Sequence, residues 1–259
     1  MGWILVMPLL IIVIFYVGGP LLIWKTHKFH IEPDLDEMDL DEVPLEDARR
    51  YVARSADALS KDNFVASRPL SVPGPTSHIF SVAVLLEHQT TQDLALVAAT
   101  MNNPAEGATQ LKASFTEFAT FFPNGASILT NNSPLPRAFE SDTRNDLLRC
   151  PGIVSLAVLY KVHRARVERS PLNKQPRLLP ADGDEAAFVG KMISRQFESQ
   201  VEKGIMEKRD GFFRPTLGGA FKMVWAALPP MKQIRKVKDS NQTAAKLRDL
   251  GFDTAGAFE

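Results

Sequence analysis

Cys150 and His163 are the two residues whose types most directly suggest catalytic chemistry. A cysteine thiolate activated by a histidine base is the nucleophile of many hydrolases. No Cys-His-Asn signature surrounds this pair, and their separation along the chain does not indicate contact. A lone cysteine before a proline is typically a small buried side chain, and His163 is expected on a helix surface. We therefore predict no catalytic residue.

Residues that could bind a metal ion are sparse. His27 and His30 lie near Glu32, but no second group of ligands accompanies them. The stretch Glu32–Asp47 contains nine acidic residues and no basic one, yet it lacks the Asp-x-Asp-x-Asp-Gly spacing of a calcium loop. Like charges at this density favour an extended, solvated spacer. We predict no metal ion and no cofactor.

The sequence lacks the short motifs that select a reaction or a cofactor. GxGxxG, GxxxxGK[ST], GxSxG, HExxH and a CxxC pair are all absent. Lys plus Arg and Asp plus Glu each number 30, so the overall charge does not favour a nucleic acid partner. The single cysteine permits no intramolecular disulfide.

Polar residues gather in the loop 130–137, which follows the last predicted strand and contains two prolines. Such a loop on a rigid sheet could bind a small polar ligand. The interpretation that we favour is that its Asn and Ser side chains cap local backbone groups. A ligand pocket between sheet and helices would be built from Asn131, Asn132, Arg137, His163 and Arg214.

The elements that must position these residues begin with a series of strands. Runs of β-branched and aromatic residues separated by turn formers predict five of them. They are Phe64–Leu70, Ile79–His88, Leu94–Met101, Leu111–Phe122 and Ala126–Asn131. Pro123-Asn124-Gly125 predicts a tight hairpin between the last two, and no connection is long enough for a crossover helix. We expect an antiparallel sheet of four or five strands with helices packed on one face.

Apolar residues at helical spacing predict helices in the remaining segments, which makes the fold α+β. The predicted helices are Pro44–Ser60, Ile153–Arg169, Asp184–Lys208, Gly218–Leu228 and Asn241–Leu250. Pro229-Pro230 should end the fourth helix, and Ser240 should cap the fifth.

The stretch Gly2–Trp24 carries no charged residue. As a helix it would reach roughly 34 Å, which is enough to cross a hydrocarbon core of about 30 Å. Trp3 and Trp24 lie near its ends, where indole rings favour the headgroup layer. No basic residue precedes it and no A-x-A-like site follows, so we predict a retained signal anchor. Pro20 after Gly18-Gly19 predicts a kinked or frayed last turn.

Lys25 and Lys28 directly follow the predicted span. The positive-inside rule then favours a single-pass membrane protein whose C-terminal part is cytoplasmic. The expected organisation has three parts. They are residues 1–30 as transmembrane anchor and basic flank, 31–43 as acidic spacer, and 44–259 as an α+β domain.

The stretch 218–238 combines an apolar helix with a basic continuation. At about 11 residues, Gly218–Leu228 is too short to span a bilayer. It could lie in the membrane interface, with Trp225 at headgroup depth and the basic residues against anionic lipid, or contact a protein partner. The interpretation that we favour is a core helix followed by a solvated basic face.

Together these patterns predict a non-enzymatic scaffold or binding module, held at a membrane surface by residues 2–24 in the lipid bilayer. The alternative is a membrane-bound enzyme or carrier for a small or lipid-like ligand. A broad exposed patch over Phe221 and Trp225 would favour the module. Polar groups converging in a deep apolar cavity would favour the alternative.

Overall fold

The computed structural model describes residues 14–76, 78–102, 109–135 and 142–252. The chain forms two compact units. Unit 1 contains the described residues 14–33 and 191–237, and unit 2 contains the described residues within 34–190 together with 238–252. The stretch 44–259, expected to form one domain, is therefore divided between the two units.

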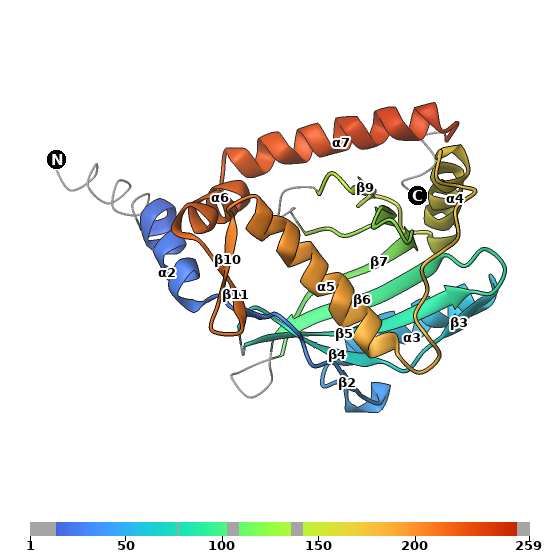
Figure 1. Ribbon diagram of the computed structural model, residues 1–259, viewed down its shortest axis with the longest axis horizontal. Helices are drawn as coiled ribbons and strands as arrows, with labels where there is room; N and C mark the ends of the chain where they lie inside the picture. Colours follow the sequence, from blue (N-terminus) through green and yellow to red (C-terminus); the bar gives the residue numbers. More distant parts are fainter. Residues whose placement is uncertain (1–13, 77, 103–108, 136–141, 253–259) are drawn as a thin grey trace. The chain divides into compact units, whose positions relative to one another are not determined.

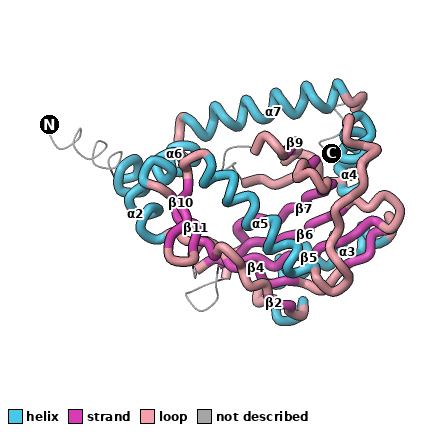
Figure 2. The backbone as a smooth tube through the Cα atoms, viewed as in Figure 1, coloured by secondary structure: helices cyan, strands magenta, loops and turns pink. Residues whose placement is uncertain are grey.

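Unit 2 is built on an eight-stranded, mostly antiparallel sheet, in which the strands from β4 to β7 lie side by side (Figures 1 and 2). Its order is β2-β4-β5-β6-β7-β8-β9, and β3 pairs with β5 outside this path. The strands are β2 (Asp36–Glu37), β3 (Phe64–Ala66), β4 (Leu70–Pro73), β5 (Ile79–His88), β6 (Leu94–Asn102), β7 (Leu111–Phe121), β8 (Ser127–Asn131) and β9 (Asn145–Arg149). The α+β fold is thus confirmed.

The predicted hairpin at Pro123-Asn124-Gly125 is confirmed. β7 and β8 pair antiparallel from Glu117↔Asn131 to Phe121↔Ser127. Gly125 has a φ of 89°, a conformation that glycine adopts without steric cost. A tight turn also joins β5 and β6, in which the Gln92 N–H donates to the His88 carbonyl at 2.9 Å.

The expectation of a purely antiparallel sheet of four or five strands is wrong. β9 pairs parallel to β8, from Ser127↔Asn145 to Asn131↔Arg149, so the sheet is mixed. The sequence of β9, Asn-Asp-Leu-Leu-Arg, has few β-branched or aromatic residues, which is why propensity did not identify it. Its place depends on backbone pairing with β8, which is a long-range interaction.

Helical residues contact both faces of this sheet, and not one face as predicted. Helices α3 (Glu46–Ser60) and α4 (Leu156–Arg169) contact each other and share one buried core with alternate residues of β5 and β6. On β7, Thr120 points toward α4, so its neighbour Phe121 points to the opposite face. There its ring contacts Phe188 of helix α5 (Glu185–Glu202), with centroids 5.7 Å apart.

The acidic stretch before α3 is packed onto unit 2, and is not the extended, solvated spacer that its charge predicted. Asp36 and Glu37 form β2 against β4, and the 3-10 helix η2 (Leu40–Glu42) follows. Leu35 and Val43 are buried. These apolar residues between the carboxylates gain more from burial than the exposed carboxylates lose by repulsion.

Unit 1 contains a three-stranded sheet of order β1 (Phe29–His30), β11 (Phe212–Pro215) and β10 (Met206–Arg209). The helix predicted to reach Lys208 ends at Glu202. The residues that follow form the antiparallel hairpin of β10 and β11. Asp210 and Gly211 make the turn with φ values of 52° and 79°. An Asp-Gly pair between two strands is a strong hairpin signal, which the helical spacing of the preceding residues obscured.

The helical part of unit 1 is formed by a π-helical turn η1 (Ile14–Gly18), helix α2 (Gly19–Thr26), helix α6 (Leu217–Ala227) and the start of helix α7 (Met231–Asp249). Gly219 lies so close to the backbone of Ile205 that a Cβ atom would stand 1.8 Å from its carbonyl oxygen. On the other side of α6, Val224 Cγ1 lies 3.5 Å from the Cβ position of Gly19. Small residues therefore let α6 pack tightly against its neighbours.

Two details of these helices differ from the prediction. Helix α7 starts directly after Pro229-Pro230, so Ser240 lies inside it and is no N-cap. The basic residues before Ser240 are good helix formers, and they continue the helix that was expected to start later. On α6, Trp225 and Leu217 are exposed while Gly219 and Ala220 are buried, so the buried face is the one with small residues.

No helix in the described ranges is long and apolar enough to cross a membrane. Residues 2–13 of the predicted span lie outside the described residues. In the described part of it, the π-helical turn changes to α-helix at Gly18-Gly19, and Pro20 occupies the first turn of α2. The predicted irregularity thus lies before Pro20, and α2 continues regularly to Thr26.

Candidate functional site

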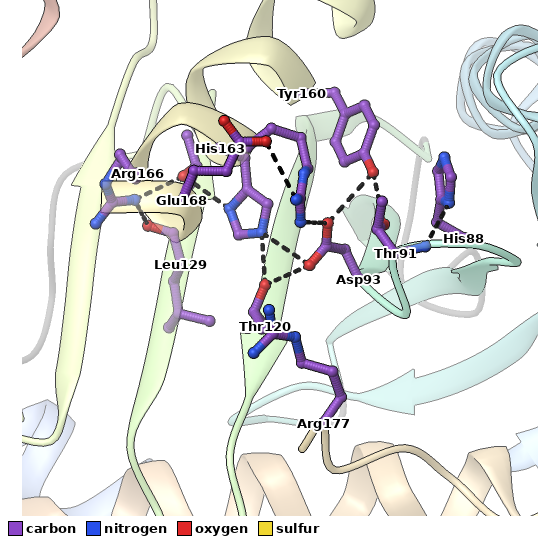
Figure 3. A network of polar contacts seen from close by, with 12 residues as sticks. His88, Thr91, Asp93, Thr120, Leu129, Tyr160, His163, Arg166, Glu168 and Arg177 are labelled. Carbon is purple, nitrogen blue, oxygen red and sulfur yellow. Dashed lines mark hydrogen bonds and ion pairs between the residues drawn. The ribbon is translucent and has the colours of Figure 1, made fainter. Parts of the chain in front are cut away.

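A continuous network of polar side chains lies between α4 and the sheet of unit 2 (Figure 3). Its centre is His163, whose ring lies between Thr120 of β7 and Thr130 of β8. Asp93, which directly precedes β6, is the acidic end of the network, and Arg166 of α4 is the basic end. All of these side chains are buried.

Local structure explains why these residues meet. On α4, His163 and Arg166 recur three residues apart on the buried face, together with Leu159 and Val162. In the β7–β8 ladder Phe118 pairs with Thr130. Thr120 and Thr130 therefore point to the same face of the sheet, as diagonal neighbours under the helix.

The hydrogen bonds of the network have one consistent direction. Thr120 Oγ1 donates to Asp93 Oδ1 at 2.6 Å. Its only proton is then used, so it accepts from His163 Nε2, 3.0 Å away. Thr130 Oγ1 accepts from Arg166 at 2.6 Å and donates to His163 Nδ1 at 3.0 Å. This order requires a neutral His163 with its proton on Nε2.

The second carboxylate oxygen of Asp93 is held by α4 as well. Arg164 donates to Asp93 Oδ2 at 2.8 Å and Tyr160 at 3.2 Å. Thr91 forms a 2.8 Å hydrogen bond with the Tyr160 hydroxyl. The buried carboxylate thus has a charged partner and two hydroxyl donors, which is what a buried charge requires.

The protonation states follow from burial and neighbouring charge. Burial lowers the pKa of His163 to about 3, against the opposing pull of the Asp93 carboxylate. The pKa of Asp93 is also lowered: burial raises it, and the Thr120 hydrogen bond and the Arg164 charge oppose burial. Burial lowers the pKa of Arg166, and Asp146, whose Oδ1 lies 2.9 Å from it, opposes this. Figure 3 shows the His163 imidazole between Asp93 and Arg166.

Chemically, this network is closed. A catalytic base needs a free lone pair directed toward a substrate, and both ring nitrogens of His163 are engaged by threonines. Thr120 and Thr130 are fully buried, so neither hydroxyl is accessible as a nucleophile. The arrangement fixes the register between α4 and three strands.

The described members of the five residues proposed for a polar pocket each have their own hydrogen-bond or ion-pair partners. His163 lies in the buried network and not on the helix surface where it was expected, because α4 packs that side against the sheet. Asn132 accepts from the Thr116 N–H and donates to the Ile153 carbonyl, so it bonds to distant backbone groups and not to the local ones that we expected it to cap. Arg214 belongs to unit 1, where it lies 3.6 Å from Asp210. Arg137 lies outside the described residues.

Asn131 takes part in a second polar cluster. Its Nδ2 donates to Glu117 Oε2 at 2.7 Å. In the parallel pairing of β8 with β9, Asn131 lies opposite Arg149. Burial raises the pKa of Glu117, with Asn131 and the Arg149 charge opposing. Arg149 also donates to the carbonyls of Ser133 and Leu135, so it holds the loop after β8.

Cys150 is fully buried, and burial raises the pKa of its thiol to about 12. A thiol at this pKa is protonated at neutral pH and is a poor nucleophile. His163, its proposed base, is bonded to Thr120 and Thr130. Both observations agree with a small buried side chain.

The residues predicted at a membrane interface lie in unit 1. Trp24, Lys25, Lys28 and Trp225 are all exposed, while Trp3 lies outside the described residues. The Lys28 ammonium stands 4.9 Å from the centre of the Phe212 ring. The Trp225 indole N–H lies 3.3 Å from the Tyr16 carbonyl, which joins α6 to η1.

The described ranges also offer no metal site. No group of three or more His, Cys, Asp or Glu side chains within them is arranged to hold a metal ion. Sequence reasoning missed Asp93, Thr120, Tyr160 and Arg166. The one local signal was on α4, where Tyr160, His163 and Arg166 follow one another at intervals of three residues.

No model of a known protein family, no curated protein and no solved structure matches this chain.

Proposed function

We propose that this protein is a single-pass, membrane-anchored and non-enzymatic module, in which residues 2–24 insert into the bilayer and the following units form a binding scaffold at the cytoplasmic surface. The observation that carries the proposal is the exposure of apolar side chains on η1 and α2. Phe15 is 56% exposed and Leu22 is 63% exposed.

This exposure supports an anchor because a soluble helix normally buries such residues. Ile14, Val17, Leu21 and Trp24 are exposed as well. They continue the uncharged stretch that begins at Gly2. Contiguous exposed apolar surface of this kind is typical of contact with a membrane or another protein.

The buried network supports the non-enzymatic part of the proposal. Asp93 and His163 would be the natural acid–base pair of unit 2, and their hydrogen-bonding atoms are engaged by neighbouring side chains. Although the buried Arg166 Nε has no hydrogen-bond partner, the atoms of Asp93 and His163 are all engaged, and a buried network of this kind stiffens a scaffold without offering these two groups to a reacting molecule.

The test compares the unchanged full chain, expressed in its host membrane, with a variant that carries two added charges, Leu10→Arg together with Ile14→Arg. We expect the full chain to resist extraction at alkaline pH and the variant to be extracted. Each arginine near the centre of a span costs about 3 kcal/mol of insertion free energy.

The control carries the same two added charges on exposed apolar positions of unit 2, Val65→Arg with Val154→Arg. It should remain in the membrane like the unchanged protein. Release of the unchanged protein by alkaline extraction would contradict the proposed anchor.

A further inference from the structure

Unit 1 exposes apolar side chains on α6 and on the first two turns of α7. Trp225 is 50% exposed, Ile234 is 55% exposed and Val237 is 60% exposed. Leu217 and Met231 are also exposed. Met231, Ile234 and Val237 follow each other at intervals of three, so they lie toward one side of α7.

Within α6 and the first two turns of α7, every charged residue is basic. From Leu217 to Lys238 the sequence contains five basic residues and no acidic one. They are Lys222, Lys232, Arg235, Lys236 and Lys238. Lys222, Lys232 and Lys236 are exposed. An apolar surface that carries basic residues on the same two helices, here called its basic border, is complementary to an anionic lipid headgroup layer.

The same surface is fixed to the segment that precedes α2. The Tyr16 hydroxyl donates to the Pro229 carbonyl, and the rings of Tyr16 and Trp225 lie edge to face with centroids 6.4 Å apart. Trp225 also donates to the Tyr16 carbonyl. Whatever medium surrounds the exposed side chains of η1 therefore lies next to Trp225.

We propose that α6 and the first two turns of α7 form a second membrane contact, which lies in the plane of an anionic bilayer surface with Trp225, Ile234 and Val237 in the interface. The proposal rests on the proposed function in one respect, because the anchor brings this surface to the bilayer.

Three physical arguments favour lipid as the occupant. Helix α6 is too short to span a bilayer, but a short amphipathic helix can lie at its surface. An indole ring that is half exposed beside apolar groups is typical of the headgroup boundary. Electrostatic attraction of several lysines adds to apolar insertion, so that neither contribution has to be large alone.

The experiment uses the full chain with Trp3→Phe and Trp24→Phe, so that Trp225 is the remaining tryptophan. The protein is reconstituted into phosphatidylcholine vesicles with or without phosphatidylglycerol, and brominated lipids report contact. We expect Trp225 fluorescence to be quenched, with a blue-shifted emission, in the anionic vesicles. High salt should reduce this quenching, because the Debye length falls to about 3 Å at 1 M.

Charge reversal tests the basic border. Lys232→Glu with Lys236→Glu should abolish the extra quenching in anionic vesicles. The matched control is Lys112→Glu with Lys161→Glu, which makes the same change of charge at exposed positions of unit 2. The control should be quenched as strongly as the parent, and circular dichroism should show both variants folded.

Other results would overturn the proposal. Equal quenching in neutral and anionic vesicles removes the role of anionic lipid. If brominated lipids do not quench Trp225 fluorescence and aqueous acrylamide does not quench it either, a protein or a second copy of this chain covers Trp225. The anchor is scored separately on the same vesicles, by retention at alkaline pH. Retention without quenching contradicts the second contact alone, and quenching without retention contradicts the anchor alone.

Discussion

His163 shows how much of this structure depends on single buried polar residues. Its imidazole is fully buried, and each ring nitrogen bonds to a threonine of a different strand. Removing one partner from such a network leaves another buried polar group unpaired, which costs about 1–3 kcal/mol. The network is therefore stable only in one arrangement of α4 on the sheet.

The lowered pKa of His163 makes a pH-dependent contribution to stability. The folded protein keeps the ring neutral down to about pH 3, whereas the unfolded chain takes up a proton below its ordinary value of 6.5. The contribution is complete above pH 6.5 and is lost as the pH falls toward 3. We expect His163→Gln to remove a slope of roughly 1 kcal/mol per pH unit in this window.

The measurement is urea unfolding of the detergent-solubilised full chain at several pH values between 4.5 and 7.5. His30→Gln, at an exposed position, is the control and should keep the full slope. Burial also lowers the pKa of His27, but that residue is present in every variant and its contribution cancels. Identical slopes for the parent and His163→Gln would contradict the neutral buried imidazole.

At the scale of elements, α6 depends on two consecutive glycines with opposite surroundings. A Cβ atom on Gly219 would meet the Ile205 carbonyl oxygen at 1.8 Å, whereas one on Gly218 meets nothing within 4 Å. The Thr216 side chain caps the helix by accepting from the Gly219 N–H at 2.9 Å. The start of α6 is thus fixed against the backbone before β10.

We expect Gly219→Ala to destabilise unit 1 by more than about 3 kcal/mol, because backbone atoms on both sides must move. Gly218→Ala should be neutral or stabilising by about 0.5–1 kcal/mol, since alanine restricts the unfolded chain and favours the helix.

Thermal unfolding followed by Trp225 fluorescence, in the Trp3→Phe, Trp24→Phe background, measures both variants. The pair is well matched because the two positions are adjacent in one helix and receive the same methyl group. Equal midpoints for both variants would show that α6 does not approach Ile205 as closely as described.

At the scale of the whole molecule, the proposed anchor and its flanking charges imply an orientation. Lys25 and Lys28 follow the apolar stretch, and both are exposed in unit 1. We expect protease to cleave the described units from the cytoplasmic side of sealed vesicles, because lysines are retained on that side.

The two faces of the vesicles are compared in separate preparations of known orientation. Lys25→Glu with Lys28→Glu should weaken or reverse the preference for cleavage from the cytoplasmic side. Lys61→Glu with Lys112→Glu, far from the span in sequence, is the control and should leave it unchanged. Protection of the parent from the cytoplasmic side would place the units outside and reverse the proposed localisation.

The sequence alone determined the elements that depend on local residue patterns. The boundaries of β5, β6 and β7 agree with the predicted runs within two residues, because apolar and β-branched residues form continuous segments there. The Pro123-Asn124-Gly125 hairpin and the α3 helix are local in the same sense.

Only the tertiary structure decided the parts that depend on distant partners. Asp93 and Arg164 are 71 residues apart, and Thr120 and His163 are 43 apart, so no local pattern pairs them. The parallel strand β9 and the packed acidic stretch are held by neighbours that their own composition does not specify. A polar side chain becomes structural or reactive according to which groups surround it, and long-range packing alone sets those surroundings.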